Sequence, residues 1–299
     1  MIECLETRLR LHSRMSRFSA WKAVAGILIL TFVVSTPGCA VLRACFHREP
    51  PCQLSPNSSV NDIVDHLNQN ITKLYSWRST NVMIHPRAKG TLPVRLSAVI
   101  AVESPRNFRI MANSLAGSEV DFGSNAERLW FWNRRGEPQR ILTASHEQIG
   151  NVQQRLNIPF QPDWLMEALG VIPIDGSRLV MQKQTTDGRI ARLLSDHVSP
   201  QGQRVQKIIV VDTCHGLILE HVVYSASGQM IAKATFGDHQ RDSVTGVILP
   251  RQISLNWPQA EMSLLIKLGN VEVNPPTMPT QTWQLPHYPN YPILDLGRN

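Results

Sequence analysis

The sequence has little charge of either sign and no stretch in which basic residues gather. Charged residues make up 18% of the 299 residues, and the formal net charge is +7. The first 38 residues carry three net positive charges, which leaves +4 on the remaining 261. The other basic residues are scattered, and the pair Arg134 and Arg135 stands alone. Nucleic-acid binding needs a basic stripe or patch, so we expect no nucleic-acid partner.

The sequence also lacks the signatures of common catalytic sites. It contains no G-x-S-x-G nucleophile elbow, no H-E-x-x-H zinc motif and no phosphate-binding glycine loop. Acid and base groups are adjacent in the pairs His146–Glu147, Asp196–His197 and Asp238–His239. Neighbouring residues on a strand point to opposite faces, so such pairs cannot share a proton. We expect neither catalytic residues nor a cofactor.

Long hydrophobic runs are missing as well. The best-defined uncharged apolar run, Ala23–Val34, has twelve residues, whereas a membrane-spanning helix needs about 20. Basic residues precede this run and the residues STPGC follow it, which is the order of parts in a secretory signal peptide. We therefore predict a signal peptide over residues 1–38. If translation starts at Met15 instead of Met1, the signal peptide is shorter and has more usual proportions. A tilted membrane anchor is the alternative.

Cysteine is scarce, with five in the chain, and one of them ends the predicted signal. The segment Thr36-Pro37-Gly38-Cys39 resembles the bacterial lipobox, in which the cysteine thiol is diacylated. Gly38 and Cys39 fit this pattern, whereas Thr36 stands where Leu is usual. Two or three acyl chains on one residue anchor a protein firmly, so we predict Cys39 as a lipid anchor. An ordinary signal with a coincidental cysteine is the alternative. Ala40, in place of Asp, favours the outer membrane by analogy with Gram-negative lipoproteins.

The remaining cysteines allow one local disulfide and no metal site. Cys45 and Cys52 lie seven residues apart in a Pro-containing segment, and in an oxidising compartment they are candidates to close a small loop. Cys214 precedes His215, but no second pair stands at the spacing of a zinc site. We interpret Cys214 as a thiol at a turn or strand end, and we expect no metal.

The folded part of the chain is expected to follow a polar linker. Residues 39–58 have the composition of a Pro-rich tether, and the predicted domain covers residues 59–274. From Ser59 to Leu74, apolar residues recur at three- and four-residue steps, which predicts an amphipathic helix. Ser59 and Asp62 match a capping box at its start. The Asn and Gln residues of this helix are expected to face water.

Most of the domain has the pattern of β-strands. Short segments rich in β-branched and aromatic residues alternate with Pro, Gly or Asn turns, in two series separated by a break at residues 146–172. Two short helices are predicted within the break, the second containing Asp163 and ending at Gly170. This pattern predicts a curved antiparallel sheet or partial barrel. The predicted strands are Val82–Ile84, Val94–Val102, Phe108–Ala112, Val120–Phe122, Leu129–Trp132, Leu179–Gln182, Ile190–Leu194, Val205–Val211, Leu217–Tyr224, Met230–Phe236, Ile248–Leu255 and Met262–Val273.

The C-terminal segment, residues 275–299, has a different composition. It is rich in proline, with Trp283, Tyr288 and Tyr291 among the prolines. Such a composition suits an extended segment rather than a strand in the middle of a sheet. We expect this tail to lie along the surface of the domain, and contact with an envelope partner is the alternative.

Four stretches of the sequence resemble the LolA/LolB superfamily of bacterial periplasmic lipoprotein carriers and outer-membrane lipoproteins. They are SVNDIVDHLNQNITKLYSWRSTNVMI, ERLWFWNRRGEPQRI, VQKIIVVDTCHGLILEHVVYSASGQMIAKATFGDH and GVILPRQISLNWPQAEMSLLIKLGNVEVN. The first resembles the leading helix and strand of that family, the second its strand and turn before the central helices, and the last two its closing hairpins. The resemblance implies an α+β fold in which a curved antiparallel sheet, a half or incomplete β-barrel, wraps around a few helices.

The resemblance also implies a function without catalysis. In that family the sheet and helices enclose an apolar cavity for acyl chains, which binds through buried hydrocarbon at roughly 25 cal/mol per Å². The expected partners are a lipid or acyl chain, the membrane at the N-terminal lipid, and other envelope proteins. The expected location is the bacterial cell envelope, at the outer membrane facing the periplasm. A structural or interaction lipoprotein with a solid core is the alternative. The candidate cavity residues are Val99, Ile110, Trp130, Trp132, Phe160, Trp164, Leu165 and Leu169.

Overall fold

A computed structural model of the chain describes residues 52–137, 139–149, 162–183, 189–199 and 202–297. These residues belong to one compact unit, Cys52–Asn299. The predicted signal peptide, the start at Met15, the lipid anchor at Cys39 and the first helix of the central break lie outside the described residues, as do Cys45 and Phe160.

The first element of the unit is helix α3, Val60–Ile71, and it begins where the sequence predicts. Ser59 Oγ accepts a hydrogen bond from the Asp62 backbone N–H at 3.2 Å, and the Asp62 carboxylate accepts one from the Ser59 N–H at 2.8 Å. These two bonds form the predicted capping box, which satisfies backbone donors that the first turn leaves free. The residues that the helix buries are Ile63, Val64, Leu67 and Ile71.

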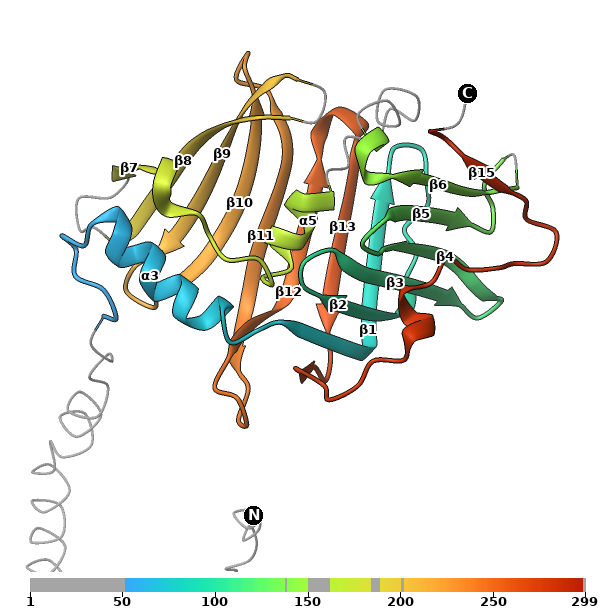
Figure 1. Ribbon diagram of the computed structural model, residues 1–299, viewed down its shortest axis with the longest axis horizontal. Helices are drawn as coiled ribbons and strands as arrows, with labels where there is room; N and C mark the ends of the chain where they lie inside the picture. The colour runs from blue at the N-terminus through green and yellow to red at the C-terminus, as the bar shows by residue number, and fades with distance from the viewer. Residues whose placement is uncertain (1–51, 138, 150–161, 184–188, 200–201, 298–299) are drawn as a thin grey trace, which may run out of the picture. The chain divides into compact units, whose positions relative to one another are not determined.

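Fifteen strands of the described residues form a single sheet (Figure 1). The first meander consists of β1 (Ser76–Ala88), β2 (Leu96–Glu103), β3 (Asn107–Ser114), β4 (Gly117–Ser124), β5 (Arg128–Asn133) and β6 (Ile141–Ser145). The second consists of β7 (Val180–Lys183), β8 (Ile190–Val198), β9 (Arg204–Asp212), β10 (Leu217–Ser225), β11 (Met230–Arg241), β12 (Ile248–Trp257) and β13 (Met262–Leu268). Two short strands complete the sheet, β14 (Glu272–Val273) beside β1 and β15 (Ile293–Asp295) beside β6.

The two meanders join where β1 pairs with β13. This pairing is antiparallel, with Val82 opposite Leu268 and Ile84 opposite Ile266. The strand order then runs from β15 at one edge to β7 at the other, so the curved sheet stays open (Figure 1). The predicted fold class, an α+β fold with a curved and incomplete antiparallel barrel around a few helices, is confirmed.

Helices α3 and α5 pack on the same face of the sheet (Figure 1). Helix α5 spans Pro162–Ala168, and Gly170, with a φ of +77°, follows its end as predicted. Trp77 on β1 donates from its indole Nε1 to the Leu169 carbonyl oxygen at 3.1 Å, which ties the end of α5 to the sheet.

Among the described residues, no helix is long and apolar enough to cross a membrane. The short 3-10 helices are η1 (His146–Gln148), η2 (Gly176–Arg178), η3 (Pro258–Ala260) and η4 (Thr280–Trp283).

The compact unit contains its own hydrophobic core. The four clusters of buried apolar residues are built from positions between Leu54 and Tyr291. A unit with a complete core of its own has the defining property of a domain that folds alone. We therefore regard residues 52–299 as able to fold without residues 1–51.

The C-terminal tail is part of this unit. Strand β15 pairs in parallel with β6, and the Tyr288 ring stacks on Trp132 with ring centroids 4.0 Å apart. The Tyr288 hydroxyl donates to the fully buried Asp121 carboxylate at 2.8 Å. Burial, followed by the charge of that carboxylate, raises the pKa of Tyr288, so the hydroxyl keeps its proton. The compact unit thus extends beyond the predicted 59–274 domain at its C-terminal end.

A disulfide joins Cys52 to Cys214, 162 positions apart in the sequence. A cysteine forms one disulfide at a time, so the predicted bridge between Cys45 and Cys52 is wrong, and so is the interpretation of Cys214 as an unpaired thiol. Backbone bonds from Gln53 N–H to the Cys214 carbonyl and from Leu54 N–H to the Thr213 carbonyl, at 2.8 and 3.2 Å, hold the same segment against the β9–β10 turn. The unit therefore begins at Cys52 rather than at residue 59.

Candidate functional site

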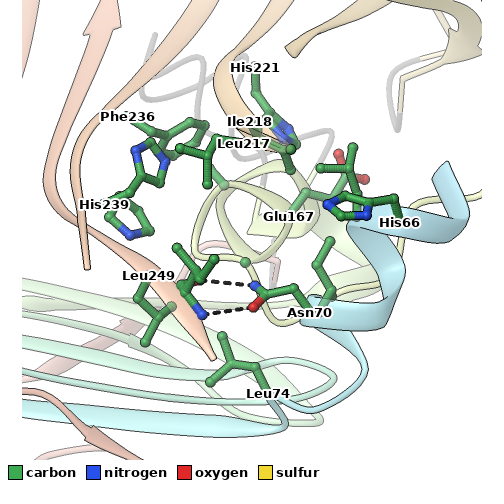
Figure 2. Close-up of a pocket in the computed structure, with 17 residues that line it drawn as sticks. His66, Asn70, Leu74, Glu167, Leu217, Ile218, His221, Phe236, His239 and Leu249 are labelled. Carbon is green, nitrogen blue, oxygen red and sulfur yellow. Dashed lines mark hydrogen bonds between the residues drawn. The ribbon is translucent and has the colours of Figure 1, made fainter. Parts of the chain in front are cut away.

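Two adjacent cavities lie between the helices and the second meander. The first has a volume of about 100 Å³ and is lined by α3, α5 and strands β10 to β12 (Figure 2). The second has a volume of about 220 Å³ and lies between α5, the segment that follows it and strands β8 to β10. Apolar side chains make up most of both walls. The residues that line both cavities are Ile71, Glu167, Ile218 and His221.

Two asparagines fix helix α3 over the cavities. Asn70 donates to the Ile248 carbonyl oxygen at 2.9 Å and accepts from the Ile248 N–H at 2.7 Å (Figure 2). Asn68 makes the same pair of bonds with Ile174, at 2.9 and 2.8 Å. The prediction that the Asn residues of this helix face water is therefore wrong for both. Each side chain takes the place of a neighbouring strand and satisfies a backbone donor and acceptor at the cavity rim.

An ion pair lies where the two cavities meet. Lys207 Nζ on β9 is 2.7 and 3.0 Å from the two carboxylate oxygens of Glu167 on α5. The side chains are only 19% and 30% exposed, so water screens the pair incompletely. Because the two charges are opposite, the pair adds no net charge to the cavities. It also fixes the position of α5 relative to the sheet.

His221 on β10 is the most deeply buried polar group that faces both cavities. Its side chain is 5% exposed, and its Nε2 atom has no hydrogen-bond partner among the described residues. The ring meets Phe236 edge to face, with centroids 5.5 Å apart. Burial, followed by the charge of Lys207, lowers the pKa of His221 to about 4. The imidazole is therefore neutral at neutral pH.

Trp164 supplies a second buried donor in the wall of the larger cavity. It is 2% exposed, and its indole Nε1 also has no partner among the described residues. Its ring lies edge to face against Trp257, with centroids 6.2 Å apart. Buried N–H groups are nearly always hydrogen-bonded in proteins, so an acceptor brought into the cavity would be favoured beside such a donor.

Ser195 and His197 are placed like the nucleophile and base of a hydrolase, but the carboxylate that would complete a catalytic triad is missing among the described residues. Ser195 Oγ lies 2.8 Å from His197 Nε2, and both residues line the larger cavity. Desolvation, followed by the charge of Lys207, lowers the pKa of His197. A hydrolase of this kind needs a carboxylate that orients the base. Asp175 lines the same cavity, but its carboxylate accepts from the Ser177 N–H, and no carboxylate of the described residues bonds His197.

The histidines of the smaller cavity do not form a metal site. His66, His221 and His239 all line it (Figure 2). The described part of the chain nevertheless contains no group of three or more His, Cys, Asp or Glu side chains placed to hold a metal ion. Burial is the main cause that lowers the pKa of His239, which keeps this ring neutral as well.

The structure brings only part of the predicted cavity set to the cavities. Trp164 lines the larger one. Leu165, Leu169 and Ile110 are buried in the central hydrophobic cluster and line neither. Val99 lies between the buried residues Ala98 and Ile100 on β2 and is only half-buried, on the opposite face.

The prediction that Trp130 and Trp132 line the cavity is wrong. Phe131, which lies between them, is opposite Phe122, and Phe122 is opposite Ile110 on the face that packs against α5. Successive strand residues alternate between faces, so the two tryptophans lie on the other face. There they pack with Ile141 and with Leu285, Tyr288 and Tyr291 of the tail.

Three residues that define the site were not predicted from the sequence, namely Glu167, Lys207 and His221. The available signal was weak, since His221 follows Glu220 in the strand LILEHVVYS and nothing in that pattern shows which of the two is buried. Glu167 and Lys207 are 40 positions apart, and nothing in either local pattern indicates that they meet.

The sequence matches no protein-family model. It also matches no curated protein sequence. Solved structures show similarity in fold. A domain whose structure is named for an outer membrane lipoprotein-sorting protein of Vibrio parahaemolyticus aligns with 75% of this chain and 97% of its own, at 9% identity and a TM-score of 0.51.

Two further structures have comparable coverage. A DUF1329 family protein from Desulfovibrio piger aligns with 77% of this chain and 98% of its own, at 11% identity and a TM-score of 0.50. A LolA superfamily protein from Nitrosomonas europaea aligns with 76% of this chain and 98% of its own, at 12% identity and a TM-score of 0.47. On the similarity to the Vibrio and Desulfovibrio structures, the chain has the LolA/LolB-like fold that its sequence predicts. At these identities the similarity concerns the fold alone.

Proposed function

We propose that this chain is a non-catalytic lipid-binding protein of the bacterial cell envelope, anchored through Cys39, whose cavities accept an acyl chain of a lipid or lipoprotein. The observation that carries the proposal is the pair of apolar cavities between α3, α5 and the curved sheet. An apolar cavity of about 150 Å³ suffices to bind a small hydrocarbon ring, and the larger cavity exceeds this volume. A solid-core structural lipoprotein would not need either space.

The energetics suit hydrocarbon better than a polar ligand. Each methylene that moves from water into an apolar wall contributes about 0.8 kcal/mol. Of the charged groups at the cavity walls, Glu167 and Lys207 are paired with each other and Asp175 accepts from the Ser177 N–H, so the described walls offer no lysine or arginine that is free to pair with a ligand. Affinity then comes mainly from chain length, as expected for a carrier that accepts acyl chains and releases them to a membrane or to another envelope protein.

The proposal is tested by feeding bacteria that express the full chain with a palmitate analogue carrying an alkyne and a photoactivatable diazirine. Incorporation without light reports covalent acylation, expected at Cys39 and lost in Cys39→Ala. Light-dependent labelling reports a bound chain, expected in peptides that contain Trp164, Ile218 or His221. Absence of light-dependent label in these peptides would contradict acyl binding.

A matched pair of variants locates the binding site. Ile218 lines both cavities, and Ile218→Trp should fill them and reduce light-dependent labelling at least fivefold, an estimate on the order of 1 kcal/mol of lost burial. The control is Leu115→Trp, because Leu115 is fully exposed in the turn between β3 and β4 and lines neither cavity. It should leave labelling unchanged. Equal light-dependent labelling of both variants would show that the acyl chain binds outside these two cavities.

A further inference from the structure

We propose that the two cavities together bind a molecule in which an ester or amide carbonyl joins two apolar arms, with the carbonyl oxygen accepting a hydrogen bond from the ring N–H of His221. This inference rests on the proposed function and adds to it the polar group of the ligand and the position of that group. It distinguishes acyl esters and amides from free fatty acids and from plain hydrocarbons.

The position of His221 indicates a polar group in the middle of the ligand. His221 is one of the four residues shared by the cavities, and apolar walls extend from it in both directions. Leu74 and Leu249 line the smaller cavity (Figure 2), and Ile209 and Leu179 line the larger one. A terminal polar group would leave one of these apolar spaces unfilled. An internal carbonyl with an arm in each cavity fills both.

The unpaired atoms indicate that this ligand group accepts hydrogen bonds. His221 Nε2 is buried without a partner among the described residues, and so is Trp164 Nε1 in the wall of the larger cavity. An indole nitrogen is a donor only, and a neutral imidazole has one N–H to donate. A carbonyl oxygen has two lone pairs and no proton, so it can only accept. A hydrocarbon would leave both donors unsatisfied, which is costly in an apolar environment.

The charges around His221 favour a neutral carbonyl over a carboxylate. The charged groups that line the cavities beside it are Glu167, Lys207 and Asp175. Glu167 and Lys207 neutralise each other, and Asp175 adds a negative charge to the larger cavity. Two further histidines of the walls, His197 and His239, have lowered pKa values, as His221 does, and are uncharged at neutral pH. His66 also lines the smaller cavity. A carboxylate would enter without a free counter-charge and would lie near Glu167. Burial of such an unpaired charge is strongly unfavourable.

The test uses residues 52–299, purified with the disulfide intact and stripped of lipid. The protein is offered an equimolar mixture of octyl octanoate, heptadecane and hexadecanoate from cyclodextrin, and the bound fraction is extracted and quantified by mass spectrometry. Octyl octanoate and heptadecane have the same chain length and differ in the ester. We expect about tenfold enrichment of the ester over heptadecane, the effect of one net hydrogen bond to a buried donor.

The variant His221→Phe should abolish this enrichment and still bind heptadecane. The control is His85→Phe, because His85 lies on β1 next to the buried Ile84 and so points to the opposite face of the sheet. His85→Phe should keep the tenfold preference. Enrichment that survives in His221→Phe, or a preference of the wild-type protein for hexadecanoate, would overturn the inference. Failure of the wild-type protein to bind any of the three would overturn the proposed function itself.

A measurement on the wild-type protein covers the case in which His221→Phe does not fold. Octyl octanoate labelled with ¹³C at the carbonyl gives an infrared band that moves to lower frequency when the oxygen accepts a hydrogen bond. We expect this shift for the bound ester relative to the same ester in heptane. A band at the heptane position would show a carbonyl without a donor and would overturn the inference.

Discussion

Asn70 on helix α3 pairs with the backbone of Ile248 on strand β12 through two hydrogen bonds, at 2.9 and 2.7 Å. The amide is thus both donor and acceptor to one residue of the sheet, at the rim of the smaller cavity (Figure 2). An interaction that needs a donor and an acceptor at fixed positions tolerates no other side chain of similar size. Its removal is therefore a sensitive test of how α3 is held over the cavities.

Asn70→Asp should destabilise the unit by about 1 to 3 kcal/mol. The carboxylate keeps the acceptor but has no N–H for the Ile248 carbonyl, which is left facing a negative charge. Urea unfolding followed by circular dichroism measures the change. Gln69→Glu is the matched control, since Gln69 is exposed on the same helix, and should alter stability by about 0.5 kcal/mol or less. Equal effects of the two changes would show that the Asn70 bonds contribute nothing specific.

Replacing Cys52 and Cys214 together by Ser should lower the free energy of unfolding by about 2 to 5 kcal/mol. The bridge closes a loop of 162 positions, and long loops lose the most entropy in the unfolded chain when they are cross-linked. Urea unfolding of the oxidised wild type and the double variant gives the difference. Cys45→Ser should have no effect on it. Peptide mapping without reduction should recover the peptides of Cys52 and Cys214 joined, and recovery of a Cys45–Cys52 peptide would contradict the structure.

Stability should fall as the pH drops from about 6.5 to about 4, with His221 as the main histidine responsible. Burial lowers the pKa of His221 to about 4 from its ordinary value of 6.5. Between these values the unfolded chain binds a proton that the folded chain excludes, so acid favours unfolding, and the contribution is fully present above pH 6.5. At 1.36 kcal/mol per pKa unit this amounts to about 3 kcal/mol.

The measurement for this prediction is urea unfolding at several pH values in wild type and in His221→Phe. The variant should show a distinctly shallower loss of stability over the same window. The lowered pKa values of His197 and His239 act in the same direction and remain in both proteins. Parallel curves for the two proteins would show that His221 is not buried in its neutral form.

Tyr288→Phe should destabilise the attachment of the tail by about 1 to 3 kcal/mol. It removes a hydroxyl donor from Asp121, a fully buried carboxylate that Arg109 and Trp130 also contact. Tyr291→Phe removes a longer bond, 3.4 Å to the Arg134 carbonyl, and should cost about 0.5 kcal/mol. Urea unfolding and susceptibility of the C-terminus to carboxypeptidase measure both. A smaller effect of Tyr288→Phe than of Tyr291→Phe would contradict the role of Asp121.

The sequence predicts the elements of this fold well because their signals are local. Alternation and turn residues locate most strands, and Ser59 with Asp62 locates the start of α3. Strand β6 (Ile141–Ser145) was missed because only the first two residues of ILTAS are strongly apolar and the rest show no alternation. Strand β15 was missed because it pairs in parallel with a segment about 150 positions away, a contact that no local pattern records.

The candidate site was harder to predict because it depends on which face each strand buries. Alternation shows that Trp130 and Trp132 share a face, but either face of a sheet buries tryptophan when a tail covers the second one. The disulfide of Cys52 and the ion pair of Glu167 with Lys207 depend likewise on the completed fold. The helix asparagines Asn68 and Asn70 look solvent-exposed in sequence because their partners are backbone groups of distant segments.

The pairing of β1 with β13 has a consequence for the order in which the protein folds. The first strand of the unit pairs with one of the last, with Val82 opposite Leu268, and α3 packs against strands that are also made late. A chain that emerges with its N-terminus first therefore displays the edge of β1 and the apolar side of α3 until almost all of it has appeared. Such delayed long-range contacts slow folding and leave strand edges open to wrong partners. We expect newly made chains to depend on a holding chaperone for that interval.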